Sequence, residues 1–347
     1  MNDHFQDDLG TTLADYTFEI MQIDEQWSVR EPRGYTWWGH ELAQRVWAEP
    51  IRSWQGANVV RVHAETDFLR DVDFAAKSLG MSAAINSFAT LSSIVLYGEQ
   101  RQAKLHCEAN LHAGNEEWLK RLFALAVAIQ AAQAHHMAGG LAEPFGGKPD
   151  VSAPPSGGRP EPDEMLNITN FFRAIASDDD VISLGASDFE SLLVQLTPLF
   201  SATEVEGLQL TATIDAQDQR SPSNLRGLFR KEESTSASLL VSAAQPHSIY
   251  GDGVLLVLGL PNKFPEEEDA AEFAASLNLI ETSESEAHFL GSWTQQKGSV
   301  SFVSFLPAIS LPPNEKSRVA LIVNMVVSTA LRARWLSELL KSPPGSH

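Results

Sequence analysis

Cysteine and histidine are the first candidates for chemistry in this chain, because their side chains can act as nucleophiles, general bases or metal ligands. The single cysteine, Cys107, lies in the segment 103–111, where odd positions are apolar and even positions are polar. This alternation predicts a strand with Cys107 on its buried face, where nothing activates a thiol. A lone cysteine also excludes an intramolecular disulfide and the paired-cysteine zinc sites.

Four histidines are candidate metal ligands. His106 and His112 share the polar face of that strand, but six residues of extended chain separate them by about 20 Å. His135 and His136 end a predicted helix over 115–137, and as adjacent residues they point to different sides. We therefore expect structural or solvated histidines and predict no metal site.

The familiar phosphate and hydrolase motifs are absent from the sequence. Gly147 and Lys148 resemble the end of a P-loop, but Ala142 stands at its leading glycine and Pro149 follows the lysine. The acidic run at 178–180 lies in a predicted loop, where no apolar surroundings would raise a carboxyl pKa. We predict no catalytic residue and no cofactor, and hence a protein that is not an enzyme.

Aromatic residues form the one constellation that suggests binding. Five of the eight tryptophans fall between residues 27 and 54. A strand predicted over 35–47 would place Tyr35, Trp37 and Trp47 on one face together with charged side chains, as in protein interfaces. We predict that these three residues bind a partner. The alternative is that the terminal helix of the repeat, over 115–137, covers the rings.

The elements that carry these residues occur twice in the sequence. Segments 56–137 and 251–340 each contain a Gly-rich turn, a strand, a short helix, a hairpin and a long helix. The helix sequences FAAKSL (74–79) and FAASL (273–277) nearly repeat. We therefore predict an α+β fold of two tandem α-β-β-β-α-β-β-α repeats, with antiparallel sheets that are each packed by helices.

The predicted boundaries follow composition. Residues 1–138 form the first repeat, the Gly/Pro-rich segment 139–163 an exposed linker, 164–341 the second repeat, and 342–347 a disordered tail. The second repeat begins with an extra helix near 164–176. Its strand over 254–260 is apolar on both faces, whereas 59–65 alternates, so the second repeat is expected to be the more enclosed.

Charge narrows the choice of partners. The chain has 45 acidic and 25 basic residues, a net charge of −20. Nucleic-acid and anionic-membrane surfaces both require basic protein surfaces, so neither is an expected partner. No basic and apolar leader is visible, and the apolar stretch 319–331 is short for a membrane span. We expect a cytoplasmic protein.

The element order, the acidity and the small size of each repeat resemble the bacterial type III secretion chaperone-like fold, which the YbjN-like proteins share. The resemblance implies a non-enzymatic protein that binds an extended or apolar segment of a partner polypeptide. It also implies a pseudo-dimer within one chain, present as a monomer or as a homodimer. Two alternatives remain: a hydrolase-type enzyme with a site between the repeats, and a regulatory or structural subunit of a larger assembly.

Overall fold

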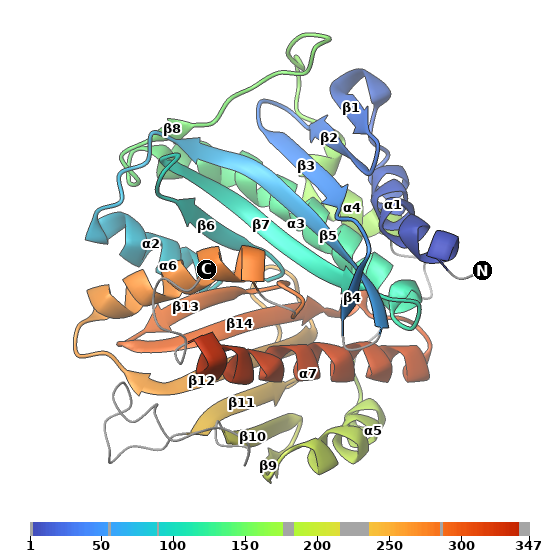
Figure 1. Ribbon diagram of the computed structural model, residues 1–347, viewed down its shortest axis with the longest axis vertical. Helices are drawn as coiled ribbons and strands as arrows, with labels where there is room; N and C mark the ends of the chain where they lie inside the picture. The colour runs from blue at the N-terminus through green and yellow to red at the C-terminus, as the bar shows by residue number, and fades with distance from the viewer. Residues whose placement is uncertain are drawn as a thin grey trace.

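Two antiparallel β-sheets, each with its own helices, make up the fold (Figure 1). The computed structural model describes residues 3–54, 57–88, 90–175, 184–215, 236–284 and 287–339. Within these ranges the protein belongs to the predicted α+β class. The predicted tail 342–347 and the acidic run 178–180 lie outside the described residues.

The first half contains ten helices and strands: α1 (Asp3–Ile20), β1 (Ser28–Glu31), β2 (Gly34–Trp38), β3 (Ala43–Ala48), β4 (Arg52–Trp54), β5 (Ala57–Arg70), α2 (Ala76–Asn86), β6 (Ser93–Tyr97), β7 (Gln102–Leu111) and α3 (Glu116–Ala142). A short strand, β8 (Lys148–Pro149), follows. The second half contains α4 (Ile168–Ile175), α5 (Ala186–Leu196), β9 (Ala202–Glu206), β10 (Gln209–Asp215), β11 (Ser236–Ser242), β12 (Gly253–Lys263), α6 (Glu267–Glu284), β13 (Ser292–Gln296), β14 (Ser299–Pro307) and α7 (Glu315–Leu339).

The two sheets have the same connection order. Sheet 1 runs β1-β2-β3-β5-β7-β6, with β4 and β8 pairing on β5, and sheet 2 runs β9-β10-β11-β12-β14-β13. Along the main path of each sheet, four strands precede the inner helix, α2 or α6, where the sequence predicted three. In sheet 1 the short strand β4, which lies off this path, is a fifth.

In the first half, the additional strand arises because the segment 35–47 was wrongly predicted as a single strand. This segment is not one strand but a hairpin of β2 and β3, in which Trp38 pairs with Ala43. The turn at 39–42 reverses the alternation, so Tyr35 lies opposite Val46 and Trp47 opposite Gly34. Trp47 therefore lies on the other face of the sheet from Tyr35 and Trp37.

Helices α1 and α3 cover one face of sheet 1, and α7 covers sheet 2 with α5 packed beside it. The inner helices α2 and α6 pack against each other between the halves (Figure 1). Each inner helix also contacts the edge strand of the other half, α2 on β13 and α6 on β6.

Matching backbone hydrogen bonds join the halves. Glu108 on β7 donates its N–H to the carbonyl of Phe289, just before β13, and Phe305 on β14 donates to Thr90, just before β6, both at 3.0 Å. A matching side-chain clamp occurs within each half. Asn86 bonds both backbone groups of Ile94, and Asn278 those of Trp293. Glu108 and Phe305 are therefore equivalent positions.

The clamps also show that the FAAKSL and FAASL segments are not equivalent in structure. Phe74 precedes α2, whereas Phe273 lies within α6. When the two halves are aligned on Asn86 and Asn278, Phe74 and Phe273 do not fall at the same position. The similarity of these segments is therefore local, and the connection order and the clamps relate the halves instead.

The predicted linker is less free than its composition indicated. Helix α3 continues through the Gly139-Gly140 pair to Ala142, because a long helix held by tertiary packing tolerates glycine. Downstream, Pro149 pairs with Leu69 on β5, and Trp38 donates its indole N–H to Ser152 Oγ at 3.0 Å. The segment therefore packs along sheet 1.

Helix α7 is the one described helix long and apolar enough to span a membrane by length and composition, over Glu315–Ser337. In the fold it lies on sheet 2, and 56% of its most apolar window is buried. Core helices of soluble proteins have the same composition.

His288 lies at the contact between the two halves, where burial keeps its ring neutral. Asn110 donates its backbone N–H to His288 Nδ1 at 3.0 Å, and Nε2 lies 2.8 Å from Asn324 Oδ1. Burial lowers the pKa of His288 to about 4. Between about pH 6.5 and pH 4, His288 is therefore protonated in the unfolded chain and neutral in the folded chain. The free energy of unfolding falls as the pH drops through this range, by up to about 3 kcal/mol.

We expect His288→Gln to flatten this pH dependence. Denaturant unfolding of both proteins between pH 7 and pH 4.5 would measure it, since the slope reports protons bound on unfolding. Carboxyl groups contribute equally to both proteins. Identical slopes would show that His288 is not held neutral.

Candidate functional site: a buried histidine and carboxylate cluster

Strands β5 and β7 lie inside sheet 1 and carry ionisable side chains on the face turned away from α1 and α3. The opposite face is apolar: Val62 and Ala64 of β5 and Cys107 of β7 pack in the core with the helices. The polar face, which we call the polar ladder, comprises Arg61, His63, Glu65 and Asp67 on β5 and Lys104, His106, Glu108 and Asn110 on β7.

The strand register places acids opposite bases on the polar ladder. His63 pairs with Glu108, Glu65 with His106, and Asp67 with Lys104. Opposite charges at directly paired positions stabilise a sheet. A shift of one residue in the register between β5 and β7 would therefore separate these opposite charges.

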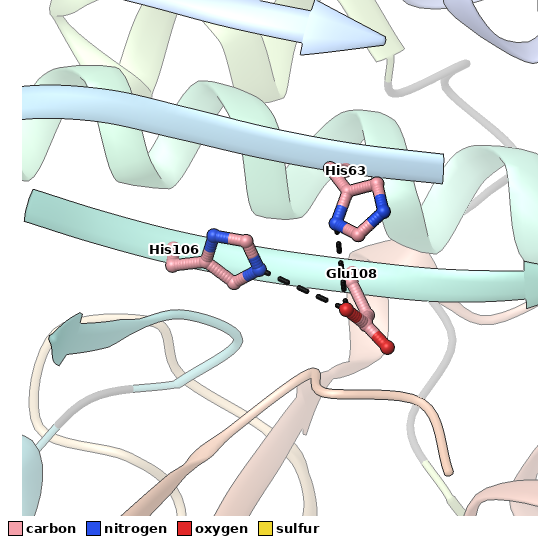
Figure 2. A group of neighbouring side chains, drawn as sticks. All are labelled: His63, His106 and Glu108. Carbon is pink, nitrogen blue, oxygen red and sulfur yellow. Dashed lines mark ion pairs between the residues drawn. The ribbon is translucent and has the colours of Figure 1, made fainter. Parts of the chain in front are cut away.

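At the centre, His63, His106 and Glu108 converge (Figure 2). His63 Nδ1 lies 3.4 Å and His106 Nε2 3.8 Å from Glu108 Oε2. All three side chains are at most 4% exposed. They are the group among the described residues whose ligand atoms converge closely enough to hold a metal ion, within 4.8 Å of one another.

These converging atoms make no hydrogen bond. His63 Nδ1, both nitrogens of His106 and both oxygens of Glu108 are buried without a hydrogen-bond partner in the described structure. The Arg61 guanidinium approaches Glu108 Oε1 at 3.2 Å, which is a charge contact. Buried polar atoms are nearly always satisfied in folded proteins, so this concentration requires a physical reason.

Outer residues hold each histidine. His63 Nε2 lies 2.9 Å from Glu49 Oε1, and the ring stacks on Trp47 with centroids 4.8 Å apart. His106 Nδ1 faces Glu65 Oε2 at 3.8 Å. Glu65 itself bonds the Lys104 ammonium at 2.7 Å.

Burial and charge compete in setting the ionisation of the polar ladder. Burial favours neutral Glu65, but its contacts with His106 and Lys104 outweigh burial and lower its pKa to about 2. Burial also favours a neutral His106, but the nearby Glu108 and Glu65 carboxylates raise its pKa. The nearby carboxylates therefore favour positive charge on His106.

The second half carries no such ladder at the matching positions. With Glu108 equivalent to Phe305, the registers make His63 equivalent to Leu255 and His106 to Val303. Leu255, Val303 and Phe305 are all apolar, in the same fold. The polar ladder is thus not a requirement of this sheet topology.

The three aromatic residues predicted to bind a partner do not form a surface. Tyr35 and Trp37 have 0% exposure, and Phe18 of α1 meets the Tyr35 ring edge-on. Trp47, on the other face, stacks on His63. The predicted common face is therefore wrong. A helix does contact the Tyr35 ring, but it is α1 through Phe18, whereas the alternative named the terminal helix.

The other predicted residues have mixed outcomes. Cys107 is fully buried as predicted, and burial raises the pKa of its thiol. His106 is buried and not solvated. His135 does not end α3. Its ring lies 5.4 Å from His40, beside a small pocket of about 240 Å³, open solvent included, that Trp37 also lines.

The sequence analysis missed His63 and Glu108 because they lie on different strands and come together only through strand pairing. The signal was present in two alternating patterns, 59–65 and 103–111. Only the register between β5 and β7 brings them together.

Comparisons of the chain with protein-family models, curated proteins and solved structures found no match. The resemblance to type III secretion chaperone-like and YbjN-like proteins stays a prediction.

The polar ladder makes a prediction about stability. Glu108→Ala removes the carboxylate that contacts the buried side chains of Arg61, His63 and His106, and we expect it to lower the free energy of unfolding by about 3–5 kcal/mol. Replacing Arg61, His63, His106 and Glu108 together by Met, Leu, Val and Leu copies the apolar character of the second half. We expect this variant to unfold at or above the wild-type denaturant concentration, because apolar groups remove the desolvation penalty.

Chemical denaturation in a chelating buffer would measure both variants. Lys148→Ala, which breaks an exposed pair with Asp71, is the control and should change stability by less than about 1 kcal/mol. If the fourfold variant were as unstable as Glu108→Ala, the polar ladder would be a structural requirement.

Proposed function

We propose that the protein is a non-enzymatic polypeptide-binding module that adds an extended partner segment to the free edge of sheet 2. The observation that carries the proposal is the exposure of edge strand β9. It pairs on one side with β10, and no other described strand pairs with it. Four of its five residues are exposed.

The backbone of β9 is suited to pairing with a further strand. Gly207, with φ 57°, occupies the first position of a two-residue turn, so Glu206 and Gln209 close the hairpin as a hydrogen-bonded pair. Alternation then directs the N–H and C=O groups of Val205 and Thr203 away from β10. Such outward groups bind an added strand.

Exposed apolar side chains accompany this edge. Val194 is 77%, Leu199 54% and Val205 47% exposed, and all three come from the continuous segment 194–205. Carboxylates at Glu204 and Glu206 are exposed on the same strand. This combination fits a segment that alternates apolar and basic residues, and the net charge of −20 favours its approach.

The matching edge of sheet 1 is less open. Arg30 on β1 forms an ion pair with Asp15 at 2.7 Å and lies over the Phe18 ring. Just before β1, Ser156 of the segment after α3 donates to the Gln26 carbonyl. Charged edges resist strand addition, which favours the second half as the binding half.

The remaining parts of the proposal follow from the same arrangement. The α2–α6 packing supports a pseudo-dimer within one chain. The ionisable cluster that a hydrolase would use is closed to solvent, which favours a binding protein over an enzyme. An acidic α+β protein whose most apolar helix covers a sheet supports a cytoplasmic location.

Val205→Pro tests the edge directly. Proline removes an outward N–H at a position that gives β10 no hydrogen bond, and it changes no charge. We expect a peptide alternating valine and lysine to bind the wild-type protein, and Val205→Pro to weaken binding about tenfold or more, equivalent to about 1.4 kcal/mol. Fluorescence anisotropy of the labelled peptide would measure this.

Val205→Thr keeps the N–H and a β-branched side chain, and should bind almost as the wild type does. A peptide alternating valine and glutamate should bind poorly. Equal affinity of the wild-type and proline variants would rule out strand addition at β9.

A further inference from the structure

We propose that His63, His106 and Glu108 form a binding site for one divalent late first-row transition-metal ion, of which zinc is the type. The ligand atoms are His63 Nδ1, His106 Nε2 and Glu108 Oε2. The proposal does not depend on peptide binding at β9.

The geometry is close to that of a bound ion. A tetrahedral zinc ion with bonds of about 2.0–2.1 Å separates its ligand atoms by about 3.3 Å. Glu108 Oε2 already lies 3.4 Å from His63 Nδ1 and 3.8 Å from His106 Nε2. Small rotations of the two rings would complete the set.

The ligand atoms are those without hydrogen bonds. Five nitrogen and oxygen atoms of these three side chains are buried and unsatisfied in the described structure. Unsatisfied buried polar atoms are costly, and coordination would satisfy one atom on each side chain at once.

The surroundings match those of metal-bound histidines. Such a ring turns its second nitrogen to a carboxylate, which fixes the tautomer and increases ligand basicity. His63 Nε2 has Glu49 at 2.9 Å, and His106 Nδ1 faces Glu65 at 3.8 Å. Arg61 holds the other oxygen of Glu108 at 3.2 Å and leaves Oε2 to the ion.

Acidic groups outnumber the permanent cations around the site. The acids are Glu49, Glu65, Asp67, Glu108 and Glu281, and the cations are Arg52, Arg61, Lys104 and Arg332. A divalent ion would offset this excess of negative charge.

The ligand types select the metal. Two imidazoles and one carboxylate suit zinc, cobalt, nickel or copper, whereas calcium and magnesium prefer sites of oxygen alone. Three protein ligands leave one position for water. Phe289 of the second half covers the site, so a bound ion would be enclosed.

Titration of the chelator-treated full-length protein with zinc and cobalt tests the proposal. We expect one ion per chain, and an intense visible cobalt spectrum typical of a tetrahedral site. Zinc should raise the melting temperature by about a few degrees, because it binds only the folded chain. His106→Gln and Glu108→Gln should lose at least about 100-fold in affinity, and Glu49→Gln about tenfold.

Matched controls are His112→Gln and His135→Gln, which remove histidines outside the site and should bind as the wild type does. If the ligand variants fail to fold, the cobalt spectrum of the wild-type protein decides alone. No stoichiometric binding, a weak six-coordinate cobalt spectrum, or affinity lost in His135→Gln and kept in His106→Gln would overturn the proposal.

Discussion

The burial of the charged face of sheet 1 is the constraint on which the structure depends. Charged groups removed from water must be paired, neutralised or coordinated. Strands β5 and β7 meet this requirement by registering acids opposite bases, so a slip of one residue would bury unpaired charges as well as expose the core. The second half completes the enclosure: Phe289 bonds the backbone of Glu108, and His288 that of Asn110.

The two halves use one topology for different physical ends. Their strand orders, inner-helix packing and asparagine clamps correspond, yet the junction face is ionisable in the first half and apolar in the second. The proposed metal site thus lies in the first half, and the proposed polypeptide-binding edge lies in the second. The exposed β9 strand, and the β1 strand whose Arg30 pairs with Asp15 of α1, fit this division.

The sequence predicted what depends on local pattern and missed what depends on register. Alternation placed Cys107 in the core, and the order of the predicted helices and strands indicated the α+β class. The tight turn between β2 and β3 was missed, which put Trp47 on the wrong face. His63 and Glu108 are 45 positions apart in the sequence, so only strand pairing could join them. The Gly/Pro-rich composition predicted a linker from residue 139, but tertiary packing continues α3 through Gly139 and Gly140 to Ala142.

Anomalous diffraction would test most directly whether the polar ladder is a metal site enclosed by the second half. Crystals of the zinc-loaded protein would be measured on both sides of the zinc absorption edge. We expect an anomalous peak about 2.0–2.2 Å from His63 Nδ1, His106 Nε2 and Glu108 Oε2. A zinc-loaded crystal with no peak between these atoms, or with its peak at another histidine, would show that the polar ladder does not bind zinc.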